Sequence, residues 1–214
     1  MLTPLLVSGI SLIFFLFFQA TGIYTGDSGD LVTAAALGGV PHPPGYPLYT
    51  LLGYILTKLP LLTISWRIAL LSSLPHAITV GLSYAIVTRL TKRTFAGFVT
   101  AFLLLGNYLF FLYSVTPEVF AMLDLFVIIL LYLVVELAER FSWRHVYMLA
   151  FIAGLSLSHH HVILFLGPAV FYWVISARNQ LLRNRWRLGV TALLFLVGFV
   201  PYLYIPIAAR SDAI

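Results

Sequence analysis

Two aspartates three residues apart, Asp27 and Asp30, are the side chains in this sequence best placed for chemistry. On a helical turn, residues three positions apart share one face. Two carboxylates there can raise each other's pKa, bind a divalent cation, or act as a general base and the group that orients it. The alternative is structural, since Asp is a common helix N-cap residue. The spacing alone leaves both interpretations open.

A histidine and a glutamate further along extend this acidic set. His42 lies in His-Pro-Pro-Gly-Tyr-Pro, where two prolines and a glycine favour a rigid turn. It is therefore either a structural residue of that turn or part of a site beside it. Glu118 follows a proline at the boundary of an apolar segment, where a carboxylate also complements a helix N-terminus. The site hypothesis takes both residues as substrate-binding.

Three consecutive histidines follow a later apolar segment, at residues 159–161. Successive side chains on a helix point about 100° apart, so at most two of them reach one site. We expect His159 and His160 to be those two. Arg67 and Arg210 are the expected contacts for a phosphate group.

Composition places this site in a membrane protein. Apolar residues make up 61% of the chain and charged residues 9%, and the mean hydropathy is +1.02, whereas soluble proteins carry about 25% charged residues. The apolar runs are continuous rather than alternating, which favours helices over barrel strands. The predicted fold class is therefore all-α, a polytopic membrane helix bundle. Because the chain has no cysteine, disulfides and cysteine nucleophiles are excluded.

Seven apolar segments are predicted to span the membrane, although several are short against the roughly 20 residues that a span needs. The first is expected to be retained rather than cleaved as a signal peptide, because the start Met-Leu-Thr-Pro lacks a basic region. Interfacial or re-entrant helices are expected over 31–37 and 48–62. The predicted spans cover residues 5–20, 66–88, 95–112, 120–137, 146–157, 162–177 and 188–207.

The basic residues sort the loops by side. The net charge of +5 could indicate nucleic acid, but nine of the twelve Lys and Arg residues fall on alternate loops that share one face. The positive-inside rule makes that face cytoplasmic, so no nucleic-acid partner is expected. The opposite, external face then receives the segments 22–49, 113–119, 158–161 and 208–214. The nine residues are Arg89, Lys92, Arg93, Arg140, Arg144, Arg178, Arg183, Arg185 and Arg187.

The polar segments resemble a known family. Asp-Ser-Gly-Asp at 27–30, Leu-Gly-Gly-Val-Pro-His-Pro-Pro-Gly-Tyr-Pro-Leu-Tyr at 37–49, a Pro-Glu turn and Gly-Leu-Ser-Leu-Ser-His-His-His at 154–161 are similar to motifs of the GT-C glycosyltransferases. More narrowly, they resemble the transmembrane protein O-mannosyltransferases that act on plexin-type receptors. The similarity extends over nearly the whole chain.

This resemblance implies a function and a domain organisation. In that superfamily the first external loop holds an acidic catalytic motif, and the donor is a sugar on a polyprenyl or dolichyl phosphate. Asp27 matches the leading acidic position and Asp30 the second, where relatives more often carry Glu. Residues 1–214 are then expected to form one transmembrane module, with a catalytic-type loop at 22–65, in the N-terminal part of a longer protein. A bacterial inner membrane with an externally facing site is the expected location.

The expected reaction is transfer of a mannose-like sugar to a hydroxyl acceptor, with a protein as the expected acceptor and a glycan as the alternative. Asp27 would take the hydroxyl proton, Asp30 would assist it or bind a divalent cation, and His or Arg would balance the leaving phosphate. One alternative is a transporter or flippase that uses the same acids as proton or substrate sites. The sequence shows no inverted repeat of the kind that many transporters carry. A non-catalytic membrane subunit is the other alternative.

Overall fold

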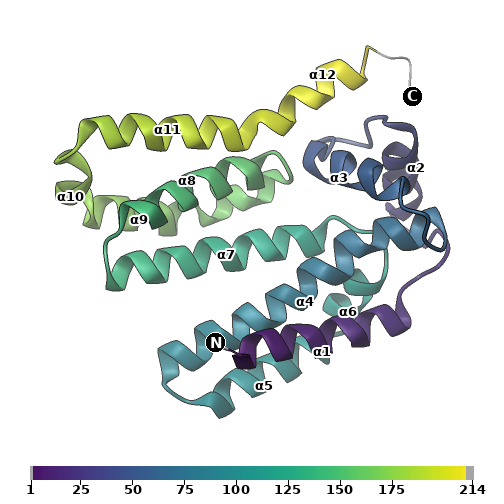
Figure 1. Cartoon of the computed structure of the whole chain (residues 1–214), viewed down its shortest axis with the longest axis horizontal. Helices are drawn as coiled ribbons and strands as arrows, with labels where there is room; N and C mark the ends of the chain where they lie inside the picture. The colour runs from purple at the N-terminus through teal and green to yellow at the C-terminus, as the bar shows by residue number, and fades with distance from the viewer. Residues whose placement is uncertain (1, 211–214) are drawn as a thin grey trace.

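The computed structural model describes residues 2–210, and the part of the chain that it describes is helical without strands. The predicted all-α class is thereby confirmed. The last four residues of the predicted external segment 208–214 lie outside the described residues. Figure 1 shows long helices running side by side, with the short helices α2 and α3 gathered at one end.

The first three helices surround the acidic motif. Helix α1 (Leu2–Phe18) leads into a loop, and α2 (Ser28–Leu37) follows it. Helix α2 ends where Gly38 adopts a left-handed conformation with φ of 72°, which glycine tolerates best. Helix α3 (Pro47–Thr57) begins with a proline in its first turn, where the missing N–H costs nothing. The His-Pro-Pro-Gly-Tyr turn connects the two and holds them side by side.

Helix α4 (Ile64–Thr91) is the longest element, and α1, α5 (Thr94–Leu105) and α7 (Phe120–Glu139) pack around it. Its first turn is capped by the Thr63 side chain, which accepts from the Trp66 N–H at 3.1 Å. Small buried residues let neighbours approach closely: a Cβ atom at Gly81 would clash with Ser8 of α1. Helix α4 therefore links the N-terminal helix to the centre of the bundle.

The second half of the chain packs on α7. Helix α8 (Trp143–Leu157) is followed by the 3₁₀-helix η1 (His161–Leu166), α9 (Gly167–Ser176) and α10 (Arg178–Leu182). Helix α11 (Arg185–Phe199) then returns along α8 and continues through η2 (Val200–Leu203) into α12 (Tyr204–Ala208). Glycines bring α8 and α11 together, because a Cβ at Gly154 would clash with the Phe195 carbonyl and one at Gly198 with that of Phe151.

The prediction of seven spans is wrong. Within residues 2–210, three helices are long and apolar enough to cross a membrane: α4, α7 and the helical stretch Arg185–Ala208. Helix α5 and α6 (Tyr108–Val115) form a fourth only if counted together, because they bend by 68° at Gly106 and Asn107. Helix α1 has 17 residues and α8 has 15, or about 26 and 23 Å at 1.5 Å per residue, which is less than the roughly 30 Å hydrocarbon core.

The ends of the helices nevertheless bring the predicted site loops to one level. In Figure 1 the C-terminal ends of α1 and α8, the N-terminal ends of α4 and α7, and all of α2 and α3 lie at the right-hand end of the bundle. The corners after α4 and α7 and the short helix α10 lie at the opposite end. The acidic loops and the arginine-rich loops are therefore separated along the bundle.

Candidate active site

Asp27 occupies the N-cap position of α2, but its side chain makes no capping hydrogen bond. The neighbouring Ser28 is fully buried, and its hydroxyl accepts from the Tyr24 N–H at 3.2 Å, which fixes the entrance to the helix. The Asp27 side chain is 56% exposed. Asp27 therefore occupies an N-cap position without using its carboxylate as a cap, and the carboxylate is accessible.

His42 lies between the two aspartates. Its ring Nδ1 is 2.7 Å from Asp30 Oδ2, and its backbone N–H donates to the same oxygen at 2.8 Å. Because the carboxylate accepts, Nδ1 carries the proton. The other ring nitrogen, Nε2, lies 3.6 Å from Asp27 Oδ2. Asp30 thus orients the imidazole through a hydrogen bond, and the opposite edge of the ring faces the Asp27 carboxylate.

Tyr46 completes this group and was missed by the sequence analysis. Its hydroxyl lies 3.3 Å from His42 Nε2, and its ring packs 5.4 Å from that of His160. Burial above all, and then the carboxylates of Asp27, Glu118 and Asp30, raise the pKa of Tyr46, so the phenol stays protonated and can donate to Nε2. The spacing of four residues between His42 and Tyr46 in the turn was the available signal.

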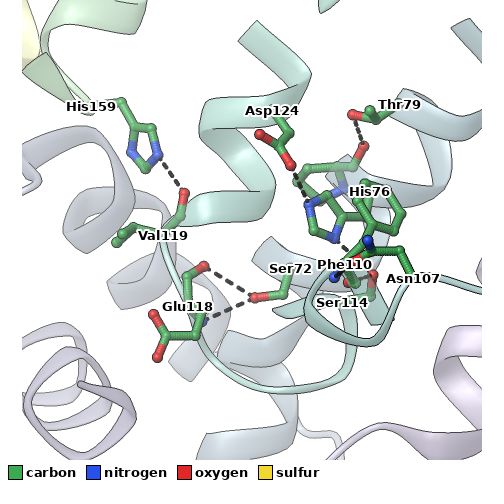
Figure 2. Close-up of polar contacts among 11 residues, drawn as sticks. Ser72, His76, Thr79, Asn107, Phe110, Ser114, Glu118, Val119, Asp124 and His159 are labelled. Atoms are coloured by element: carbon green, nitrogen blue, oxygen red, sulfur yellow. Dashed lines mark hydrogen bonds and ion pairs between the residues drawn. The ribbon is translucent and has the colours of Figure 1, made fainter. Parts of the chain in front are cut away.

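Glu118 approaches the same group from the loop before α7. Its backbone is held by Ser72 of α4, which accepts from the Glu118 N–H at 3.1 Å and lies 3.2 Å from its carbonyl oxygen. Figure 2 shows the Glu118 carboxylate turned away from Ser72. The residue is 6% exposed, Oε2 is buried without a hydrogen-bond partner, and Oε1 would lie 3.6 Å from a Cβ at Gly26. The carboxylate therefore faces the loop that carries Asp27.

The electrostatic state of Glu118 follows from this position. Burial first, and then the Asp27 carboxylate, raise the pKa of Glu118 to about 7, while the Val119 N–H and His42 act in the opposite direction. Near neutral pH, about half of the molecules carry a protonated Glu118, which can donate a hydrogen bond. In the others the carboxylate can only accept hydrogen bonds. Strongly shifted acids of this kind are typical of functional sites.

His159 and His160 lie behind and beside Tyr46. His159 is 1% exposed, and its Nε2 lies 2.9 Å from the Val119 carbonyl, so Nε2–H donates and the unpartnered Nδ1 is left as an acceptor. Burial lowers the pKa of His159 to about 4, which keeps the ring neutral. His160 is only half-buried and lines the site through its contact with Tyr46. His161 instead stacks on Tyr202, at a centroid distance of 5.8 Å.

The two arginines expected at the site behave differently. Arg67 donates to the carbonyls of Thr57, Leu59 and Thr63, and among the described residues no contact joins it to the aspartates. Its guanidinium closes the loop between α3 and α4. Arg210 is exposed after α12. That helix reaches the first loop, because the Tyr204 hydroxyl donates to the Gly39 carbonyl at 3.0 Å.

Figure 2 shows a second polar cluster to the right of Glu118, formed by residues of α4, α6 and α7. His76 of α4 is 1% exposed, with Nδ1 2.7 Å from the Ser114 hydroxyl and Nε2 3.1 Å from Asp124 Oδ2. Its ring stacks on Phe110 at 3.8 Å. His76 and Asp124, each costly alone in an apolar helix, compensate each other by pairing.

The described residues form no group of three or more His, Asp or Glu side chains arranged to hold a metal ion. In the first loop, His42 occupies the space between Asp27 and Asp30 and takes an oxygen of Asp30. The aspartates therefore do not form a shared carboxylate cage, and we derive no step through a divalent cation.

Comparison with known proteins gives one family. The family model described as the protein O-mannosyl-transferase TMEM260 N-terminal domain matches residues 27–183. The chain is 30% identical over 237 residues to protein O-mannosyl-transferase tmem260 of Dictyostelium discoideum, covering 97% of this chain and 28% of that protein. It is 34% identical over 194 residues to protein O-mannosyl-transferase TMEM260 of Mus musculus, covering 86% and 27%. The chain thus spans little more than a quarter of these relatives. No solved structure matches it.

Proposed function

Because this chain belongs to the family of the protein O-mannosyl-transferase TMEM260 N-terminal domain, we propose that it carries the acidic site of a membrane glycosyltransferase. The site would move a mannose-like sugar from a lipid-phosphate donor to a hydroxyl group of a protein. The matched residues begin at Asp27 and include His42, Glu118 and His160. We place the enzyme in a bacterial inner membrane, with this site on the external face.

One observation carries the proposal: an exposed carboxylate, Asp27, faces an imidazole that a second carboxylate orients. Such an arrangement suits proton transfer, because a general base needs a fixed direction and access to its substrate. A purely structural N-cap would have placed the Asp27 oxygen on a backbone N–H, and that bond is missing. The exposed end of the bundle also suits a donor whose head group lies at the membrane surface.

The proposed step is an inverting displacement with Asp27 as general base. The acceptor hydroxyl oxygen forms a bond to the anomeric carbon, and the bond from that carbon to the lipid-phosphate oxygen breaks. The Asp27 carboxylate takes the hydroxyl proton, and the electron pair of the broken bond leaves with the lipid phosphate. His42, which Asp30 orients, lies 3.6 Å from the Asp27 carboxylate and can respond to the charge that changes there.

The remaining residues would bind substrate. Glu118, with a pKa of about 7, and half-buried His160 offer donors and acceptors for sugar hydroxyls beside the Tyr46 ring. Arg210 is the proposed contact for the leaving phosphate, supported by the docking of its helix on the first loop. Arg67 is not proposed for this role, because its Nε and Nη1 groups donate to backbone carbonyls.

The test uses the complete polypeptide in detergent or in vesicles, with polyprenyl-phosphate mannose as donor and a serine- or threonine-bearing protein as acceptor. We expect mannose on the acceptor, in the anomeric configuration opposite to that of the donor. A nucleotide-linked mannose should not replace the lipid-linked donor. Transfer with retained configuration, transfer only from the nucleotide sugar, or movement of lipid-linked sugar across vesicles without transfer would contradict the proposal.

A further inference from the structure

Residues of α10, of the start of α11 and of the corner between α7 and α8 line a groove. Figure 1 shows these elements at the end of the bundle opposite to the acidic site. The groove has a volume of about 360 Å³ and is lined by Phe141, Trp143, Gln180, Arg183, Asn184 and Arg187. Its walls therefore combine two cations, two amides and two aromatic rings. That size lies within the range of small-ligand sites.

The arginines of this groove are held by the local structure. Asn184 caps α11, since its side chain accepts from the Arg187 N–H at 3.3 Å. The Arg187 guanidinium lies over the Trp143 ring, 5.5 Å from its centroid, a cation–π contact that leaves guanidinium N–H groups for a ligand. Arg183 precedes the capped turn and also lines the groove. Planar guanidinium groups and amide N–H groups together favour a phosphate.

A second groove of about 370 Å³ continues from the first, and both include Phe141 and Gln180 in their walls. It runs between α7 and α9 along Val134, Leu137 and Trp173. The acid that borders it, Glu139, is already paired with Arg89 at 2.7 Å. The second groove, whose lining residues are mostly apolar but include Glu139 and Ser176, thus begins where the arginine-lined groove ends.

We propose that these two grooves bind one anionic phospholipid, with its phosphate on Arg183 and Arg187 and an acyl chain between α7 and α9. A phosphate alone would use only the first groove, whereas a lipid uses both. Basic pockets between helices at the membrane surface are known to bind acidic lipid head groups in this way. Trp143 and Phe141 lie where aromatic residues favour the interface. This site is separate from the proposed transfer reaction.

The chain offers a matched control for the test. Arg178 and Arg185 belong to the same loop region but do not line the groove. The complete polypeptide would be purified in detergent with equal amounts of phosphatidylglycerol and phosphatidylcholine, and bound lipid counted by native mass spectrometry. We expect wild type to retain phosphatidylglycerol preferentially. Arg183→Gln/Arg187→Gln should lower that preference about tenfold or more, and Arg178→Gln/Arg185→Gln, with the same loss of charge, should not.

Two further measurements separate a lipid from a free anion and from general charge effects. Ser176→Trp, at an exposed position on the wall of the second groove, should reduce retention while both arginines remain. Inorganic phosphate at millimolar concentration should not displace the lipid. Equal loss in both double variants, full displacement by phosphate, or no effect of Ser176→Trp would overturn the proposal. As a control, the melting temperature of each variant would be measured to check that the variant is folded.

Discussion

Glu118 shows how the environment of one residue sets its chemistry. Its backbone is fixed by Ser72, its carboxylate is buried beside the Asp27 loop, and Oε2 has no partner. The facing titratable groups are Asp27 from the start of α2, His42 from the turn, and Tyr46 and Tyr49 from α3. Desolvation first, and then the Asp27 carboxylate, raise the pKa of Glu118 and favour its protonated form.

The stability of the protein should record this shift. The folded pKa of Glu118, about 7, exceeds the ordinary value of 4.5, so the folded state holds the proton more tightly and loses stability as pH rises from about 4.5 to about 7. Glu118→Gln cannot ionise. From pH 5 to pH 8 we therefore expect its free energy of unfolding to gain about 2–3 kcal/mol relative to wild type. Thermal melts of both proteins at the two pH values measure this; a constant difference would refute the shift.

Asp30 gives a second prediction, about the order of the turn. It accepts both the ring N–H and the backbone N–H of His42, and charge-assisted hydrogen bonds contribute about 1.5–3 kcal/mol. Asp30→Asn should therefore speed amide exchange in the segment 41–46 by about tenfold or more. Hydrogen–deuterium exchange measures this directly. Asp27→Asn is the control, because no backbone N–H of the turn is bonded to Asp27; equal uptake in both variants would disprove the role of Asp30.

Sequence reasoning found the residue types of the site but not their connections. Asp27, His42, Glu118 and His160 were predicted from motif and position, and the structure brings them together around Tyr46. The bridging geometry of His42 depends on the path of the turn between α2 and α3, which spacing does not determine. Arg67 was predicted to contact a phosphate, but its Nε and Nη1 groups donate to backbone carbonyls of the neighbouring loop.

At the scale of elements, the glycines of α8 and α11 determine how closely these helices pack. A Cβ at Gly198 would clash with the Phe151 carbonyl, a backbone atom that cannot move aside alone. Gly198→Ala should therefore separate the helices and lower the melting temperature, corresponding to a loss of about 1–3 kcal/mol. Gly189→Ala on the same helix meets nothing within 4 Å, so it should be neutral or stabilising. Equal melting temperatures for the two variants would exclude close packing at Gly198.

The element boundaries were predicted well where polar residues punctuate the chain and poorly elsewhere. Thr63 and the Lys92-Arg93 pair frame α4 near its predicted ends. The predicted span at 95–112 is instead two helices, because Gly106 ends one and Asn107 caps the next, with its side chain accepting from the Phe110 N–H at 2.9 Å. Hydropathy averages over such a break, so an apolar run of span length was mistaken for one straight helix.

For the whole molecule, the separation of acidic and basic loops along the bundle predicts opposite sides of a membrane. The chain has no cysteine, so single cysteines report on one position each. Thr25→Cys, exposed before α2, should react with an impermeant thiol reagent added outside intact cells. Asn179→Cys, at an exposed position of α10, should react only after permeabilisation. The reverse pattern would invert the proposed orientation.

The number of spans could not be predicted from composition, although the membrane class could. Apolar content identifies a bundle in lipid, but a short apolar helix is compatible with spanning, tilting or packing inside a larger assembly. Helix α8 illustrates this, since its 15 residues pack mainly on α11 and α7. Helix α8 is too short to be counted as a span. Its length is known only once the structure shows where the helix begins and ends.

If Asp27 is the general base of sugar transfer, Asp27→Asn should lose most of the transfer activity and keep the fold. The amide keeps the size of the side chain and makes no change to a capping bond, because none exists. In the complete polypeptide, with a lipid-linked mannose donor and a protein acceptor, we expect Asp27→Asn to lower the rate of mannose transfer by a factor of about 10²–10⁴. Its melting temperature should equal that of wild type. Glu139→Gln, at the opposite end of the bundle, should transfer normally. Near wild-type transfer by Asp27→Asn would show that Asp27 is not the general base.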